Sequence, residues 1–150
     1  MEDLPYIDEH SLAIAAAPSD VWRALLSVLA REVGGVPRPV KALLGVQPSE
    51  LRGDWMGTLR VGDSMPGFSV SECVVASRLA LRGQHRFSRY ALVFVLDGDG
   101  ASCTLRAQSW GAFPGLKGRG YRALVIGSGG HRVAVRRMLR SVARRAGVKR

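Results

Sequence analysis

Residues 114–150 read PGLKGRGYRALVIGSGGHRVAVRRMLRSVARRAGVKR, and this stretch decides the fold class. Apolar and small residues recur at helical spacing from Tyr121 to Val142, whereas the arginines lie mostly off that stripe. The pattern predicts one long basic helix, interrupted at its middle by residues 127–130. Each glycine there costs up to about 1 kcal/mol in a helix interior. We therefore expect close packing on a sheet, a kink, or space for a ligand beneath the helix.

The length of 150 residues and the hydrophobic fraction of 47% predict one folded domain spanning residues 1–150. No apolar run approaches the roughly 18 residues that a membrane-spanning helix needs. Acidic residues near the N-terminus, Glu2 and Asp3 among them, are not typical of a secretion signal, so a cytoplasmic location is expected. Cys73 and Cys103 lie among apolar neighbours and are interpreted as core residues.

The net charge of +10 is unevenly distributed along the chain. All 12 acidic residues lie at or before Asp99, and residues 100–150 carry basic residues alone. This asymmetry predicts either an anionic partner for residues 117–150 (nucleic acid, ribosome or anionic membrane) or the solvated outer face of a helix.

Hydrophobic periodicity and turn residues divide the rest of the chain. A strand is expected at 10–16, and a helix that starts near Pro18 carries Val21, Trp22 and Leu25 at helical spacing. Residues 34–40 are expected to form a loop, 40–46 a short helix or strand, and 53–61 an extended segment around Trp55. Further antiparallel strands are predicted at 68–76, 78–87, 89–96 and 102–112.

Two of these strands show unusual faces. Residues 89–96 are apolar on both faces, which indicates a central strand or an edge that meets a second copy, so monomer and homodimer both stay open. Trp110 falls on the polar face of the last strand, which predicts a β-bulge or a protein contact there.

Three segments together resemble the START-like, Bet v 1-like and polyketide cyclase-like superfamily. They are HSLAIAAAPSDVWRALL at 10–26, LALRGQHRFSRYALVFVL at 79–96 and FPGLKGRGYRALVIGSGGHRVAVRRML at 113–139. The resemblance implies an α+β helix-grip fold, in which a curved antiparallel sheet wraps around a long C-terminal helix with an apolar cavity between them. It implies binding of a small apolar or aromatic molecule, and in some members cyclase chemistry.

The sequence carries no complete motif for dinucleotide binding or metal binding. VIGSGG at 125–130 lacks the third glycine of a dinucleotide-binding loop, because Arg132 stands at that position. His10, His85 and His131 are far apart in the sequence, so no metal site and no cofactor are expected.

The candidate site follows from the inner stripe of the helix and the aromatic strand faces. His131 is the best polar candidate, and the alternative enzyme hypothesis uses His131 or His85 as proton shuttle with Tyr90 or Tyr121 as donor. The predicted ligand-binding residues are Trp55, Phe68, Leu81, Phe87, Tyr90, Phe94, Phe113, Tyr121, Ser128 and His131.

Overall fold

The computed structural model describes residues 4–32, 51–55, 58–85, 88–113, 115–123 and 129–147, and for residues 85, 116, 117, 121 and 131 it describes the backbone. The elements are β1 (Tyr6–Ile14), α1 (Pro18–Glu32), β2 (Ser64–Met65), β3 (Phe68–Val74), β4 (Arg78–His85), β5 (Ser88–Gly98), β6 (Cys103–Ala112), α3 (Gly115–Arg122) and α4 (Gly130–Gly147).

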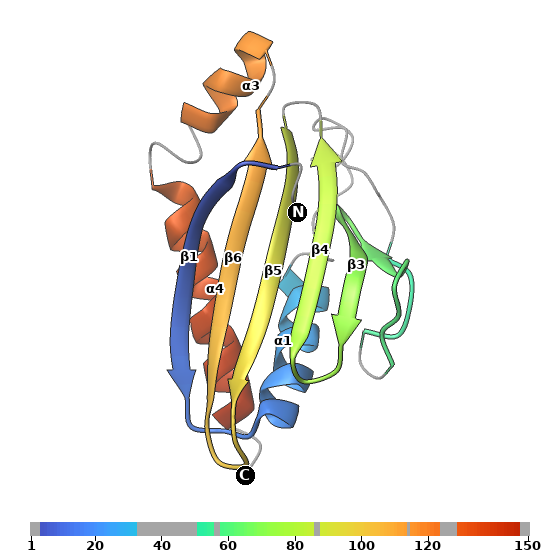
Figure 1. Ribbon diagram of the computed structural model, residues 1–150, viewed down its shortest axis with the longest axis vertical. Helices are drawn as coiled ribbons and strands as arrows, with labels where there is room; N and C mark the ends of the chain where they lie inside the picture. The colour runs from blue at the N-terminus through green and yellow to red at the C-terminus, as the bar shows by residue number, and fades with distance from the viewer. Residues whose placement is uncertain are drawn as a thin grey trace.

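The strands form one antiparallel sheet in the order β1-β6-β5-β4-β3-β2. Both α1 and α4 lie against the same face of this curved sheet, which we call the inner face, and α3 extends beyond the end of β6 (Figure 1). The fold is α+β and matches the helix-grip architecture expected from the sequence.

The central position of β5 confirms the prediction from its doubly apolar pattern. β5 pairs with β4 on one side and β6 on the other. Its residues Leu92 and Phe94 join the hydrophobic core on the inner face, and Val93 on the outer face is also buried. Burial on both faces explains why alternation is weak in this strand.

Helices α1 and α4 supply the rest of the core. Pro18 begins α1, where its fixed φ suits the first helical turn and its missing N–H costs nothing. Buried residues on the two helices face the sheet and each other: Val21, Trp22, Leu25, Leu26, Val28 and Leu29 from α1, and Val135, Leu139, Val142 and Ala146 from α4. Burying each large apolar side chain stabilises the fold by roughly 1.5–3 kcal/mol.

The prediction of one long helix interrupted at residues 127–130 is wrong in that the stretch forms two separate helices, with Gly129 just before the second. The structure has two helices there, α3 and α4, which point in different directions (Figure 1). Gly129 has φ +84°, a left-handed conformation that cannot continue a right-handed helix. The remaining helix α4 has 18 residues, and at 1.5 Å per residue it is about 27 Å long.

The extended segment expected at 53–61 is also not a strand in its described part. Trp55 lies in a turn, and an isolated bridge between Arg52 and Ser64 ties the segment to β2. Strand β3 ends at Val74 rather than 76, because Ala76 has φ 60° in the turn to β4. For the bulge or contact predicted at Trp110, the structure has a register shift on the partner strand, between Tyr6 and Asp8 of β1, whereas β6 alternates regularly and Trp110 packs against Tyr6. The segments expected at 34–40 and 40–46 lie outside the described residues.

Candidate functional site

Tyr90 lies between two glycines on the inner face of the sheet. It pairs with Gly83 on β4 and with Gly111 on β6. A Cβ atom at Gly83 would collide with the carbonyl oxygen of Gly67 and would lie 3.0 Å from Cε1 of Tyr90. The Tyr90 ring therefore lies over the bare backbone of β4, in a position that a larger residue at 83 would take.

Other aromatic rings gather around this row. Phe68 contacts Tyr90 edge-to-face, with ring centroids 5.2 Å apart and an interplanar angle of 66°. Such pairs stabilise their partners by about 0.5–1.5 kcal/mol beyond buried area. At the other end of the row, a Cβ at Gly111 would lie 3.2 Å from Cε2 of Phe113. Phe68, Tyr90 and Phe113 thus line one end of the sheet, and we call these three rings the aromatic cluster.

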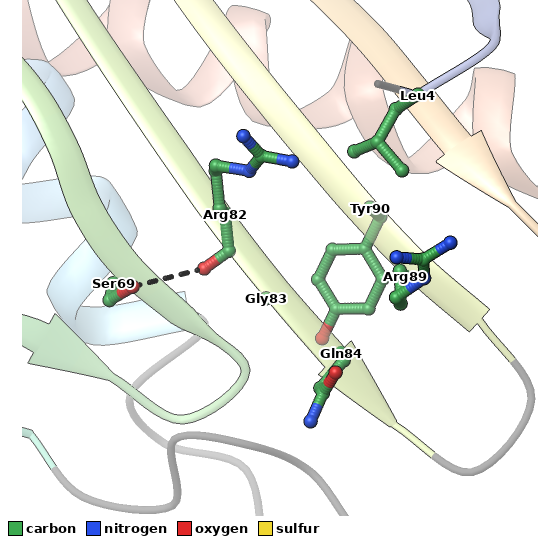
Figure 2. Close-up of a pocket in the computed structure, with 7 residues that line it drawn as sticks. All are labelled: Leu4, Ser69, Arg82, Gly83, Gln84, Arg89 and Tyr90. Atoms are coloured by element: carbon green, nitrogen blue, oxygen red, sulfur yellow. Dashed lines mark hydrogen bonds between the residues drawn. The ribbon is translucent and has the colours of Figure 1, made fainter. Parts of the chain in front are cut away.

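A pocket of about 300 Å³ opens beside Tyr90 (Figure 2). This volume is at the lower end of the usual range for small-molecule sites. Its lining residues are Leu4, Ser69, Arg82, Gly83, Gln84, Arg89 and Tyr90. Ser69, Arg82, Gln84 and Arg89 belong to rows that alternate with the inner-face rows of Leu81 and Gly83, so the polar side chains of this pocket lie on the outer face of the sheet.

A second pocket, of about 410 Å³, lies at the opposite end of the sheet. It is formed by residues 15–17, by Asp20, by the β5–β6 hairpin at Gly100 and Ala101, and by Ala146 of α4. Alanines and glycine dominate this lining, and Asp20 is paired with Arg23. This second pocket therefore offers a ligand few distinctive contacts, and the candidate site on the inner face is the aromatic cluster.

An aspartate–histidine pair lies on the inner face of β1. The exposure of β1 alternates, with Glu9, Ser11 and Ala13 exposed on the outer face. His10 Nε2 lies 3.1 Å from Oδ2 of Asp8, and the two side chains are 12% and 23% exposed. An imidazole held by a carboxylate in this way has a fixed tautomer and orientation.

The neighbours of this pair place it near the aromatic cluster. Asp8 is the register partner of the buried Ser109 on β6, one inner-face row before Gly111. In the part of the chain that the structure describes, the second ring nitrogen of His10 has no hydrogen-bond partner. The pair can therefore accept a proton or a hydrogen bond from a molecule held on the inner face.

The Asp8–His10 pair was not predicted from the sequence, because the three histidines were compared only with each other and lie far apart in the chain. The relevant signal was local: two residues apart on a strand share one face. A polar pair at that spacing, on the strand face that also carries Leu12 and Ile14, marks a polar spot in an apolar surface.

The predicted ligand-binding residues fall into separate groups. Phe68, Tyr90 and Phe113 come together in the aromatic cluster, whereas Leu81 and Phe94 are fully buried in the core. Trp55 is 3% exposed, and its indole N–H donates to the carbonyl oxygens of Arg52 and Ser64 at 3.0 and 3.1 Å.

The remaining predicted residues have no described side chain. Phe87 and Ser128 lie outside the described residues, and for His85, Tyr121 and His131 the backbone alone is described. His85 ends β4, Tyr121 lies in α3 and His131 lies in the first turn of α4.

The two cysteines are free and lie on different strands. Burial raises the pKa of the Cys73 thiol, with the nearby Asp63 carboxylate adding to the effect. Burial also raises the pKa of Cys103. Both thiols stay neutral at physiological pH, and a neutral thiol is a poor nucleophile.

Among the described residues, no group of three or more His, Cys, Asp or Glu side chains is placed to hold a metal ion. No helix within the described ranges combines the length and the apolar character needed to cross a membrane.

No protein-family model matches the sequence, and no curated protein matches it. Solved structures do match in fold. The Zhui aromatase/cyclase from Streptomyces sp. R1128 is 12% identical and superimposes with a TM-score of 0.62, over 96% of this chain and 94% of that chain. Norcoclaurine synthase from Thalictrum flavum is 13% identical with a TM-score of 0.54, over 93% and 86%. A conserved protein from Geobacillus kaustophilus is 12% identical with a TM-score of 0.55, over 93% of each chain.

These similarities establish the class of fold. The chain has the helix-grip fold of polyketide cyclase-like and Bet v 1-like proteins, as its sequence resemblance implied. At such identities the similarity extends to the fold and leaves function to be argued from the site.

Proposed function

We propose that the protein binds a small apolar or aromatic molecule against the inner face of the sheet, beside Tyr90 and beneath the C-terminal helical segment. The observation that carries this proposal is the row Gly83–Tyr90–Gly111. Glycines on the two neighbouring strands flank an aromatic ring. The carbonyl of Gly67 and the Tyr90 ring take the space over Gly83, and Ile7 and Phe113 take the space over Gly111. The glycines let aromatic rings pack closely at this end of the sheet, and rings placed in this way can stack on, or pack edge-to-face with, an aromatic ligand.

The aromatic cluster supports the same class of ligand. Phe68 and Tyr90 present an edge-to-face pair on the inner face, and the polar Asp8–His10 pair lies beside Ser109, one inner-face row away from Gly111. A ligand with an aromatic body and a polar edge matches both surfaces. The helix-grip fold is consistent with this proposal, since the named similar proteins include an aromatase/cyclase.

Binding of β-naphthol, followed by isothermal titration, tests the proposal. Tyr90→Ala should weaken binding about tenfold, which corresponds to about 1.4 kcal/mol. Tyr6→Ala is the matched control, because Tyr6 lies on the outer face and is 58% exposed. Equal affinity in Tyr90→Ala and the unmodified protein, or no binding at all, would contradict the proposal.

A second candidate function is proton transfer on such a ligand, and the Asp8–His10 pair favours it. His10 would take a proton from a carbon next to a ligand carbonyl, which leaves an enolate, and would return it to the oxygen to give the enol. The reaction is an isomerisation and needs no co-reactant. Asp8 would stabilise the imidazolium that forms in between.

Exchange of the acidic C–H protons of β-tetralone in D₂O, followed by NMR, tests this second function. The protein should accelerate exchange, and His10→Gln should abolish that acceleration while β-tetralone still binds. Asp8→Asn should lower the rate and leave the affinity unchanged. Exchange no faster than in buffer would exclude the proton-transfer function and leave the binding function in place.

A further inference from the structure

Helix α4 carries a row of arginines on the side that faces away from the sheet. At about 100° per residue, Arg132, Arg136, Arg137, Arg140 and Arg144 fall within an arc of about 140°. All five are exposed, and the opposite side of the helix, including Val135 and Leu139, is buried against the core. We call these five residues the arginine row.

The arginine row has no acidic partner in the described part of the chain. By contrast, Arg23, Arg78 and Arg106 each form an ion pair with a carboxylate. No acidic residue follows Asp99 in the sequence, so α4 itself supplies none. Within the arginine row, Arg144 donates to the hydroxyl of Ser141, which donates in turn to Oε1 of Glu32 on α1, so Arg144 reaches a carboxylate through a hydroxyl and not by a direct ion pair.

Helix stability alone does not explain this row. Cations near the C-terminal end of a helix are favourable, which accounts for Arg144. Arg132 lies in the first turn, where a cation is unfavourable, and that turn has no acidic residue. Arg132, Arg136, Arg140 and Arg144 also repeat at four-residue spacing, so like charges repel at each step. The free protein is destabilised by this arrangement, and a polyanion would relieve it.

We propose that the arginine row docks on the phosphate backbone of a double-stranded nucleic acid. The four-residue repeat places arginines about 6 Å apart along a rigid line of about 18 Å. Guanidinium groups bind phosphate oxygens in a bidentate fork, which lysines cannot do. A rigid line of such groups matches phosphates that are themselves held in a regular array, and a fluid lipid surface has no such array.

The surroundings of the row favour a duplex over a single strand or a membrane. Binding of a single strand uses aromatic rings for base stacking, and α4 has none. Insertion into a membrane uses the apolar side of an amphipathic helix, and that side of α4 is buried in the core. The docking is expected to be independent of base sequence, because phosphate contacts carry no sequence information.

Fluorescence anisotropy with labelled RNA and DNA duplexes, between about 50 and 200 mM salt, tests the proposal. The unmodified protein should bind, with an affinity that falls steeply as salt rises. A variant with Arg136→Gln, Arg140→Gln and Arg144→Gln should bind weakly, and its slope of log affinity against log salt should be shallower by about 2 to 3. Replacing the same three residues with lysine should restore most of the slope, because the charges are kept.

The matched control replaces three arginines that already have acidic partners, Arg23, Arg78 and Arg106, with glutamine. This variant loses the same charge and should keep the slope of the unmodified protein. Equal loss in both variants would show an effect of net charge and overturn the proposal. Binding of phosphatidylserine vesicles through the arginine row, without binding of either duplex, would overturn it as well.

Discussion

The ring of Tyr90 lies over Gly83, its register partner on β4, so closely that a Cβ on residue 83 would be 3.0 Å from Cε1 of the ring. This relationship links the fold to the proposed site. The same glycine that lets the turn at Gly67 approach β4 also leaves room for the ring of Tyr90.

Gly83→Ala should destabilise the protein by about 1–3 kcal/mol. The added methyl group meets the backbone carbonyl of Gly67 and forces the turn at Gly67 away from β4. Urea unfolding measures this change. Gly100→Ala is the control, since nothing lies within 4 Å of a Cβ there. Similar unfolding midpoints for the two variants would contradict the close approach of Gly67.

Gly129→Ala should lower the free energy of unfolding by about 1–2 kcal/mol, because φ +84° is strained for any residue with a side chain. Gly120→Ala should have the opposite sign. Residue 120 lies inside α3 with open space around it, and alanine is favoured over glycine in a helix by about 1 kcal/mol. Thermal unfolding of both variants shows whether each substitution raises or lowers the stability of the protein. Stabilisation by Gly129→Ala would show that α3 and α4 form one helix.

Trp55→Phe should destabilise the protein by about 1–3 kcal/mol, since it removes the N–H that the carbonyl oxygens of Arg52 and Ser64 accept. Ligand affinity should change little, because the indole acts as a structural clamp. Parallel urea unfolding and β-naphthol titration separate the two effects. A large loss of affinity in a folded variant would show that Trp55 belongs to the binding site, as predicted from the sequence.

Stability should fall as pH rises above the ordinary thiol pKa of 9.0, because burial raises the pKa of both Cys73 and Cys103 in the folded protein. The folded state then holds protons that the unfolded state has lost, and the free energy of unfolding decreases with pH until the folded pKa is passed. The Cys73→Ala, Cys103→Ala double variant should show a shallower decline between pH 9 and the folded pKa. Parallel curves for the two proteins would contradict the raised pKa values.

The strand faces could be predicted from the sequence because alternation is a local property. Leu79 and Leu81 point to the core as their spacing indicated, and the doubly apolar pattern of 89–96 correctly placed that strand in the middle of the sheet. The sequence pattern predicts an interruption at residues 127–130 but not that α3 and α4 point in different directions. Apolar residues continue through 124–126, so the stripe alone does not reveal the left-handed φ of Gly129.

The candidate site depended on register, which is not a local property. Gly83, Tyr90 and Gly111 are far apart in the sequence, and only the pairing of β4, β5 and β6 puts them side by side. The two-residue spacing of Asp8 and His10 alone predicts that the two side chains share one face of a strand. The position of this pair near the aromatic cluster depends on the pairing of β1 with β6, which puts Asp8 beside Ser109.

The most direct test of the binding function is native mass spectrometry of the protein purified from its own host, followed by organic extraction. We predict a small apolar or aromatic molecule bound to the unmodified protein and to Tyr6→Ala, and missing from Tyr90→Ala. Unmodified protein that carries no such molecule, and that also fails to bind β-naphthol, would contradict the account.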